Sequence, residues 1–183
     1  LSPLNQFIEK TKFKMETPKT VLLALRQGDW MVSIDLKDAY FHVPIHQDSR
    51  KFLRFVWEGR TYQFRALCFG LSTAPQVFTR VMAPVSLLCH QRGIRLIRYL
   101  DDWLIMADSA HDLQAQTTWL LELCSQLGLI VNLEKSELQP ARQRVYLGMD
   151  LDSSEALARP SLARVRKFQT ILRGFLTSHL QPA

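Results

Sequence analysis

The sequence contains no long apolar run. Hydrophobic residues make up 47% of its 183 positions, but charges, Pro84 or Ser86 interrupt the longest apolar stretches. None approaches the roughly 18 consecutive apolar residues of a membrane span. Residues 1–5 (LSPLN) lack the basic start and apolar run of a signal peptide, and the chain does not begin with Met. We therefore expect an excerpt of a longer intracellular protein, in the cytoplasm or the nucleus, with no membrane partner.

Cysteine is also scarce. Cys68, Cys89 and Cys124 lie far apart and show no zinc-ligand spacing, so we expect reduced, partly buried thiols. The chain has no internal repeat and no low-complexity linker. Its length suits one domain with a sizeable core, and no clear boundary precedes about Ser153.

Positive charge is in excess. The formal net charge is +6 and the isoelectric point is about 9.5. This suits a nucleic-acid partner, although a merely basic protein fits the charge equally well. The basic residues have aromatic or aliphatic neighbours, which places them on folded elements. Three groups stand out: Arg50, Lys51 and Arg54; Arg92, Arg95 and Arg98; and Arg159, Arg164, Arg166, Lys167 and Arg173.

Apolar periodicity predicts a strand, a hairpin, a helix, a second hairpin, a helix and a strand, in that order. This order favours an α+β fold with a βαββαβ antiparallel sheet and helices on one face. The expected elements are a helix from Pro18 capped by Thr17, strands 31–36, 52–57, 62–65, 94–100 and 103–107, a helical run 72–90 interrupted at Pro84, a helix 111–127, short strands near 138 and within 145–151, and a basic helix from Pro160 to about 176.

Two adjacent acids, Asp101 and Asp102, stand between apolar strand-like runs, and Asp35 ends another apolar strand. In a βαββαβ layout these two places can be neighbours. Carboxylates brought together there can hold two Mg²⁺ ions about 3.5–4 Å apart, as in-line phosphoryl transfer requires. The backbone carbonyl of Leu36 is a plausible additional ligand. The alternative is a hairpin turn and a strand end that are only structural.

Five motifs together resemble the palm region of reverse transcriptases, particularly those of gypsy-like and DIRS-like retrotransposons. They occur in the family's order and at compatible spacing over nearly the whole chain. The motifs are 33–41 (SIDLKDAYF), 69–75 (FGLSTAP) followed by Phe78, 99–102 (YLDD), 128–136 (GLIVNLEKS) and 146–148 (YLG).

The resemblance implies a polymerase palm with a ferredoxin-like sheet, part of the fingers and the start of a thumb. It divides the chain into 1–152, partial fingers and palm, and 153–183, the thumb or connection helix. It also implies an RNA-directed DNA polymerase that extends a primer 3′-hydroxyl with deoxynucleoside triphosphates on an RNA template, using two Mg²⁺ ions for which Mn²⁺ can substitute. RNA–DNA duplex is the implied partner, while the oligomeric state is left open.

Individual roles follow from the resemblance. Asp35 and Asp101 would bind the metals with Asp102 assisting. The nucleotide would contact Tyr40 as a steric gate, together with Phe69, Gly70 and Lys135. Lys135 could instead be a solvated loop lysine, and Tyr40 could instead be a core aromatic. The primer end would meet Leu147 and Gly148, and the duplex backbone would meet Arg164, Arg166, Lys167 and Arg173, although these could form an ordinary solvated helix face.

Parts of the family's architecture are missing. Leu4-Asn5, near the start of the chain, resembles the end of a conserved fingers region, and the thumb is expected to be short. Two other functions therefore stay open. One is a truncated or domesticated remnant that binds nucleic acid without catalysis. The other is another palm-class polymerase, such as an RNA-dependent RNA polymerase, which Tyr40 and the Leu-Asp-Asp form argue against.

Overall fold

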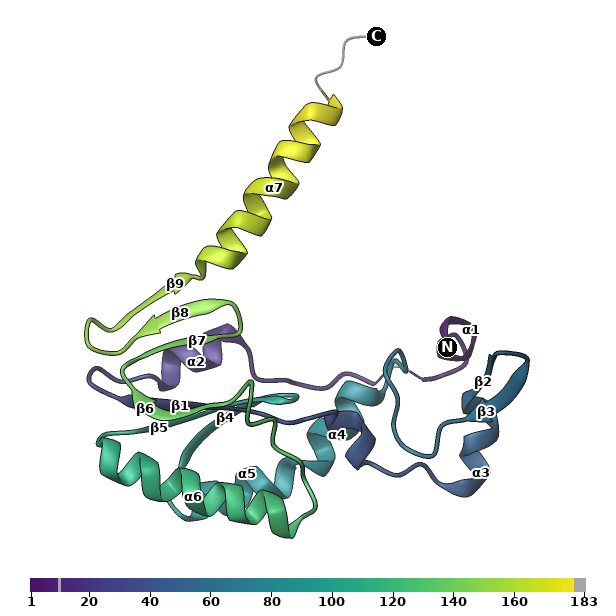
Figure 1. The fold of residues 1–183 in the computed structure, drawn as a ribbon, viewed down its shortest axis with the longest axis horizontal. Coiled ribbons are helices and arrows are strands. Elements are labelled where there is room, and N and C mark those ends of the chain that lie inside the picture. The colour runs from purple at the N-terminus through teal and green to yellow at the C-terminus, as the bar shows by residue number, and fades with distance from the viewer. Residues whose placement is uncertain (10, 180–183) are drawn as a thin grey trace.

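A four-stranded antiparallel sheet in the order β4-β5-β1-β6 forms the centre of the molecule (Figure 1). The structure, a computed structural model, describes residues 1–9 and 11–179. The strands are β1 (Trp30–Asp35), β4 (Arg95–Tyr99), β5 (Asp102–Ala107) and β6 (Glu137–Ala141). Helices connect β1 to β4 and β5 to β6, so the predicted α+β fold with its βαββαβ core is confirmed.

Both faces of this sheet are covered by other elements. Side chains alternate between the two faces of a strand, so one strand can contribute to two cores. On one face, Val32 and Ile34 of β1 pack with helices α4 (Ala74–Val81), α5 (Ala83–Gln91) and α6 (Ala110–Gln126). On the other face, Met31 packs with α2 (Pro18–Ala24) and with a second sheet (Figure 1). The apolar residues on both faces of β1 reflect these two cores.

Local sequence signals set several helix ends. Thr17 and Thr20 form a capping box at the start of α2, with Pro18 in the first helical position. The predicted helical run 72–90 is broken at Met82, which ends α4 and precedes α5, because Pro84 cannot continue a helix that began before it. Gly128, with φ of +72°, follows α6 and ends it, which agrees with the predicted helix 111–127.

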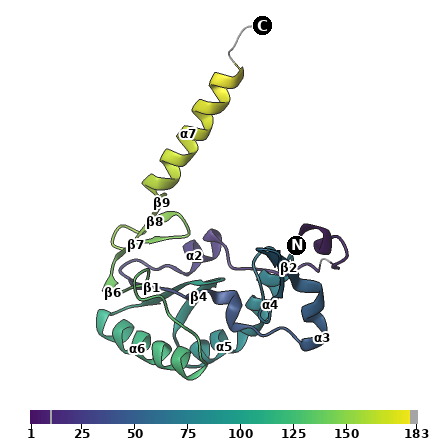
Figure 2. The ribbon, with the colours of Figure 1, turned by 45° about the vertical axis from the view of Figure 1, so that its right-hand side comes forward.

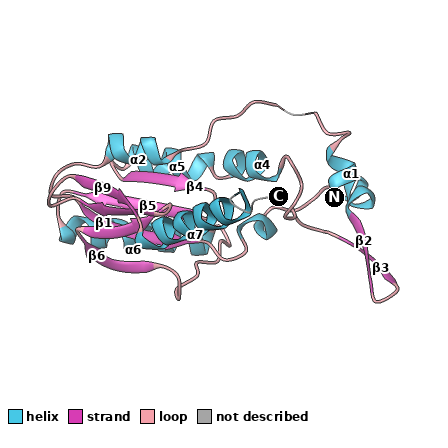
Figure 3. Ribbon diagram, turned by 90° about the horizontal axis from the view of Figure 1, so that it is seen from above, coloured by secondary structure: helices cyan, strands magenta, loops and turns pink. Residues whose placement is uncertain are grey.

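The β2–β3 hairpin lies at the end of the molecule away from the central sheet (Figure 3). Strands β2 (Arg54–Trp57) and β3 (Arg60–Gln63) are exposed along their whole length. Their turn residues, Glu58 and Gly59, both have positive φ, as a type I′ hairpin requires. The same region contains the short helices α1 (Ser2–Asn5), α3 (Gln47–Arg50) and η2 (Lys51–Leu53), whereas η1 (Ala39–His42) lies against α4 and contributes Ala39 and Tyr40 to the core under the central sheet.

A second sheet, β7-β8-β9, covers the α2 face of the central sheet. Its strands are β7 (Gln143–Tyr146), β8 (Met149–Asp152) and β9 (Leu157–Pro160). The sequence did not predict β9, and Pro160, expected to begin the last helix, ends this strand instead. Proline is tolerated there because β9 pairs on one side with β8 and is the edge strand.

The last helix, α7 (Leu162–His179), projects away from the rest of the molecule (Figures 1 and 2). Its predicted apolar side is present but exposed, at Leu162, Val165, Phe168, Ile171, Leu172 and Phe175. No helix in the described part of the chain is long and apolar enough to cross a membrane. The division at residue 153 stays a prediction, and residues 180–183 of that second unit lie outside the described residues.

Candidate active site

Three acids meet at the end of the central sheet. Asp35, the last residue of β1, is directly opposite Asp102, the first residue of β5, in the antiparallel register. Asp101 precedes Asp102 in the turn that joins β4 to β5. The structure therefore brings together the two acidic segments that the sequence placed on separate strands.

The turn that carries Asp101 is held in an uncommon backbone conformation. Leu100 has a positive φ of +55°, which is rare for a residue with a branched side chain and tends to mark functional sites. Its carbonyl accepts a hydrogen bond of 2.9 Å from the indole nitrogen of Trp103. The Asp101 carbonyl accepts one of 2.9 Å from the amide of Leu36. These contacts fix the turn against β1.

Burial, and then the charges of neighbouring acids, raise the pKa of two of the three carboxylates, those of Asp35 and Asp102. Burial raises the pKa of Asp102 to about 6, and the charges of Asp101 and Asp35 add to that rise. Burial also raises the pKa of Asp35, offset by the charge of Lys135 and a hydrogen bond from Asn132. Like charges held this close at half-buried positions would be stabilised by a cation.

The donor set fits Mg²⁺, which takes hard oxygen ligands and often only one or two protein carboxylates. The Leu36 amide donates to the Asp101 carbonyl, so Leu36 lies next to the acids, and the role of its own carbonyl as a ligand stays a prediction. Among residues 1–9 and 11–179, however, no three His, Cys, Asp or Glu side chains are already gathered into a metal cage. The acids are therefore neighbours that still have to converge on an ion.

A small cavity of about 110 Å³ opens beside two of these acids. It brings together side chains from four of the five motifs, since Asp35, Asp102, Lys135 and Leu147 all line it. Lys135 is exposed in a loop, but its charge acts on both Asp35 and Asp102. Lys135 is thus a solvated loop lysine that also lies within reach of the acids, and its role toward the nucleotide stays a prediction.

The predicted gate, Tyr40, is almost buried, with 8% of its surface exposed. Its ring centroid lies 4.9 Å from that of Phe69 and 5.7 Å from that of Phe78. Burial raises the pKa of the Tyr40 phenol, and the nearby Asp101 charge raises it further. Tyr40 is thus both a core aromatic and a neighbour of the acids, so the two alternatives for this residue are compatible.

The loop that contains Phe69 and Gly70 is tied down from the N-terminus. The Asn5 side chain donates to the Gly70 carbonyl and accepts from the Ser72 amide, both at 2.8 Å. Gly70 adopts a φ of +84°, which a residue with a Cβ rarely adopts. Phe69 is 59% exposed, so one face of its ring is open to a ligand.

The turn between β7 and β8 consists of Leu147 and Gly148, with φ of +49° and +72°, in a tight hairpin. Arg164 at the start of α7 lies over this turn. Its guanidinium donates to the Leu147 carbonyl at 3.4 Å, and a Cβ on Gly148 would stand 3.3 Å from its Cδ. The side chain of Arg164 is therefore engaged with the turn.

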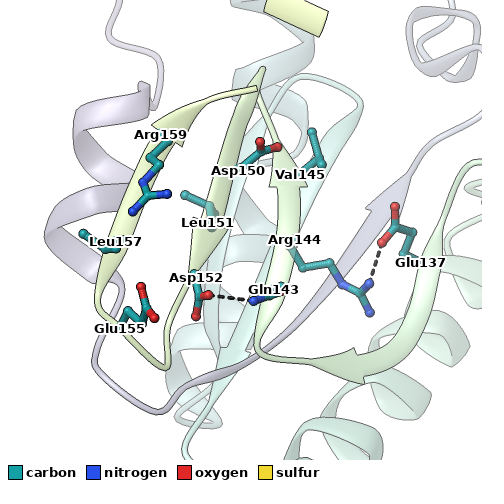
Figure 4. Close-up of a pocket in the computed structure, with 10 residues that line it drawn as sticks. All are labelled: Glu137, Gln143, Arg144, Val145, Asp150, Leu151, Asp152, Glu155, Leu157 and Arg159. Carbon is teal, nitrogen blue, oxygen red and sulfur yellow. Dashed lines mark hydrogen bonds and ion pairs between the residues drawn. The ribbon is translucent and has the colours of Figure 1, made fainter. Parts of the chain in front are cut away.

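The other predicted phosphate-contacting residues are not part of this site. Arg166, Lys167 and Arg173 lie along the projecting helix α7. A larger cavity of about 400 Å³ on the second sheet is lined by none of the three acids, although it shares Glu137 and Val145 with the cavity beside them (Figure 4). Its charged lining includes the ion pair Arg144–Glu137 and a hydrogen bond from Gln143 to Asp152.

Comparison with known proteins identifies the fold and the family. Residues 1–151 match the family described as reverse transcriptase (RNA-dependent DNA polymerase). The chain belongs to the reverse transcriptase family. The match covers most of this reverse transcriptase chain and all five motifs that led to the resemblance.

Curated relatives are viral polyproteins. The genome polyprotein of Petunia vein clearing virus is 26% identical over 149 residues, covering 81% of this chain and 7% of the relative. The Gag-Pol polyprotein of Gibbon ape leukemia virus is 29% identical over 172 residues, covering 88% of this chain and 10% of the relative. The chain thus spans a small part of the proteins that it matches.

Solved structures confirm the fold. A foamy viral protease-reverse transcriptase in complex with double-stranded DNA superimposes with a TM-score of 0.77 at 24% identity, over 91% of this chain and 28% of that chain. The same viral enzyme in complex with an RNA/DNA hybrid gives a TM-score of 0.75, also at 24% identity, over 91% of this chain and 22% of that chain.

Several supporting residues were not predicted. Trp103, Asn5 and Ser136 hold backbone at the site, the last by accepting a hydrogen bond from the Asp35 amide at 3.0 Å. His42 accepts one of 3.0 Å from the Ile130 amide. For Trp103, Ser136 and His42 the only available signal was position within or next to a motif, whereas Asn5 lies far from all five motifs in the sequence.

Replacing Asp102 by Asn is expected to stabilise the protein when divalent cations are absent. The folded pKa of about 6 lies above the ordinary value of 3.8, so ionisation of Asp102 costs folding stability. In the unmodified protein, the folding stability that comes from a neutral Asp102 is fully present below about pH 4. It is lost as the pH rises through the folded pKa of about 6. With allowance for solvent screening, the gain at neutral pH is about 1 kcal/mol, or roughly 2–4 °C in melting temperature.

Thermal unfolding in a chelator across this pH range measures the effect. The difference between Asp102→Asn and the unmodified protein should shrink toward pH 4, because both side chains are then neutral. Asp48→Asn, which removes a carboxylate that is 87% exposed, is the control and should change little. A variant that is less stable than the parent at neutral pH would contradict the electrostatic argument.

Proposed function

We propose that the chain is the palm of an RNA-directed DNA polymerase that adds deoxynucleotides to a primer 3′-hydroxyl. The observation that carries this proposal is the placement of Asp35 opposite Asp102, with Asp101 in the adjoining turn. Lys135 and Leu147 line the same cavity as two of these acids. Membership of the reverse transcriptase family supports the choice of phosphoryl transfer over a structural role for the three acids.

Asp35, Asp101 and Asp102, together with the Leu36 carbonyl, are the residues that would hold two Mg²⁺ ions, or Mn²⁺ in their place. When bound, such ions supply activation of the attacking oxygen and stabilisation of the leaving one. The side chains contribute the hard oxygen ligands and hold them on a rigid sheet end. Lys135 adds positive charge near the leaving pyrophosphate.

The nucleotide would be bounded by Tyr40, Phe69 and Gly70. A ring at Tyr40 pressed against C2′ of the sugar leaves no room for a ribose hydroxyl and selects by exclusion. Gly70 allows the backbone to approach the nucleotide and the template closely. The turn of Leu147 and Gly148 would place the primer 3′ end beside the acids.

RNA template and DNA primer are the proposed partners, consistent with a net charge of +6. The foamy viral relatives were solved with double-stranded DNA and with an RNA/DNA hybrid, which supports duplex binding by this fold. An origin in a retrotransposon is the finer proposal. It rests on motif details such as Phe69, where retroviral enzymes tend to carry Gln.

Loss of a single charge on α7 is expected to lower the salt dependence of duplex binding. Each phosphate contact contributes about 0.9 to the slope of log K against log salt concentration. Lys167→Ala should therefore reduce the slope by about that amount. Lys19→Ala removes another exposed lysine, from α2, and should leave the slope unchanged. An unchanged slope for Lys167→Ala would remove this residue from the duplex contact.

Primer extension on an RNA template decides between the polymerase and a module that only binds. The proposal expects incorporation of deoxynucleotides that requires Mg²⁺ and stops with a chelator. Gel shift of the same RNA–DNA duplex, with no incorporation in Mg²⁺ or Mn²⁺, would instead establish the binding-only alternative for this chain. Preferential incorporation of ribonucleotides would indicate an RNA-dependent RNA polymerase.

A further inference from the structure

Tyr146 connects the β7–β8 turn to the catalytic hairpin. It is the last residue of β7, immediately before Leu147, and only 4% of its surface is exposed. Its hydroxyl donates a hydrogen bond of 2.9 Å to the backbone carbonyl of Asp102, across 44 positions of sequence. A buried phenol reaches this carbonyl only if β7 lies directly against the start of β5.

The bond completes a set of three. The consecutive carbonyls of Leu100, Asp101 and Asp102 each accept a hydrogen bond, from the Trp103 indole, the Leu36 amide and the Tyr146 hydroxyl respectively. Trp103 and Leu36 belong to the central sheet or its immediate extension. Tyr146 belongs to the second sheet, which has no strand pairing with the first.

The β7–β8 turn, Leu147 and Gly148, is held from its other side by α7 and by the residue before that helix. The Ser161 amide donates to the Gly148 carbonyl at 2.9 Å, and Arg164 reaches the Leu147 carbonyl. The β7–β8 turn therefore has the base of α7 on one side. On its other side is Tyr146, which connects it to the β4–β5 hairpin. A displacement of the turn would be transmitted to Asp102 through the phenol.

We propose that Tyr146 is a positioning residue, whose hydroxyl fixes the Asp102 backbone and so sets the separation between the catalytic acids and the Leu147–Gly148 turn. Its catalytic consequence rests on the proposed function, because the turn matters to the reaction only if it places a primer end. Its structural consequence does not: the hairpin should be less firmly held without the hydroxyl, whatever the protein does.

The hydroxyl, and not the ring, carries this role. The ring packs in the core beside Met31, Leu104 and Met149, a contact that phenylalanine would preserve. Burial, with the charges of Asp102 and Glu16, raises the pKa of Tyr146 well above its ordinary value, so the oxygen stays protonated and able to donate. Tyr146→Phe keeps the ring and removes the hydroxyl, with its hydrogen bond to the Asp102 carbonyl and its contact with the Tyr99 backbone in the same hairpin.

Hydrogen exchange of Tyr146→Phe tests the proposal directly on the 183-residue chain. The peptide covering residues 99–103 should exchange about five- to tenfold faster, the factor that one neutral hydrogen bond is worth. In primer extension, kcat should fall by about the same factor. The KM for the deoxynucleotide and the Kd for duplex should not change, because the nucleotide and duplex contacts are intact.

Thr117→Val is the matched control. Thr117 is 4% exposed and donates a similar bond of 2.7 Å to the Leu113 carbonyl in α6, on the opposite face of the sheet. It should lower stability comparably but leave exchange at 99–103 and kcat unchanged. Unaltered exchange at 99–103 in Tyr146→Phe, or an equal rise in Thr117→Val, would overturn the proposal.

The two proposals fail separately. If the unmodified protein incorporates no nucleotide, the proposed function fails, while the exchange of residues 99–103 still decides the role of Tyr146. If the unmodified protein extends primers but Tyr146→Phe shows neither faster exchange nor a lower kcat, only the positioning role is lost.

Discussion

Asp101→Asn is expected to abolish primer extension while leaving duplex binding intact. The substitution keeps the size of the side chain and the Asp101 carbonyl bond to Leu36, so the turn should keep its shape. It removes one anionic oxygen ligand at the sheet end, where metal-assisted charge stabilisation is worth several kcal/mol. We expect extension to fall by about a thousandfold or more, measured as single-nucleotide incorporation in Mg²⁺.

Two measurements accompany this experiment. Duplex Kd should equal that of the parent, because Asp101 contributes no positive charge to phosphate binding. Asp48→Asn, on the exposed helix α3, removes the same charge far from the three acids and should extend primers normally. Extension by Asp101→Asn at the parent's rate would reject the assignment of the site.

Tyr40→Ala is expected to admit ribonucleotides. The ring of Tyr40 is held in place by Phe69 and Phe78, so it cannot swing aside to accommodate a 2′-hydroxyl. Removal of the ring opens that space, and the preference for deoxynucleotides should fall by about a hundredfold. The ratio of kcat/KM for a deoxynucleotide to that for its ribonucleotide measures the effect.

Stability has to be separated from selectivity here. Truncation of a buried aromatic to alanine costs about 3–5 kcal/mol of folding stability, so Tyr40→Val, which fills part of the space, is a second variant. Tyr40→Phe keeps the ring and should retain discrimination. A deoxy/ribo preference that is unchanged in Tyr40→Val or Tyr40→Ala would leave Tyr40 as a core aromatic without a gating role.

Much of the fold followed from local patterns. The Thr17–Pro18 helix start, the break near Pro84 and the turn at Glu58–Gly59 all appear where the sequence places them. Each depends on a few neighbouring residues whose backbone preferences are strong. The error at Pro160 has the opposite origin, because a proline at a helix start and a proline at an edge-strand end look alike until the pairing of β9 with β8 is known.

The chemistry of the site was likewise present in the sequence as residue types, since Asp35 and the Asp101–Asp102 pair are unusual at the ends of apolar strands. Their meeting was decided by the tertiary structure, through the register that places Asp35 opposite Asp102. The same holds for Asn5 on Gly70 and Tyr146 on Asp102, which join residues 65 and 44 positions apart. A single side-chain hydrogen bond over such a separation has no periodic signal, because it depends on how whole elements pack and not on the residues beside it.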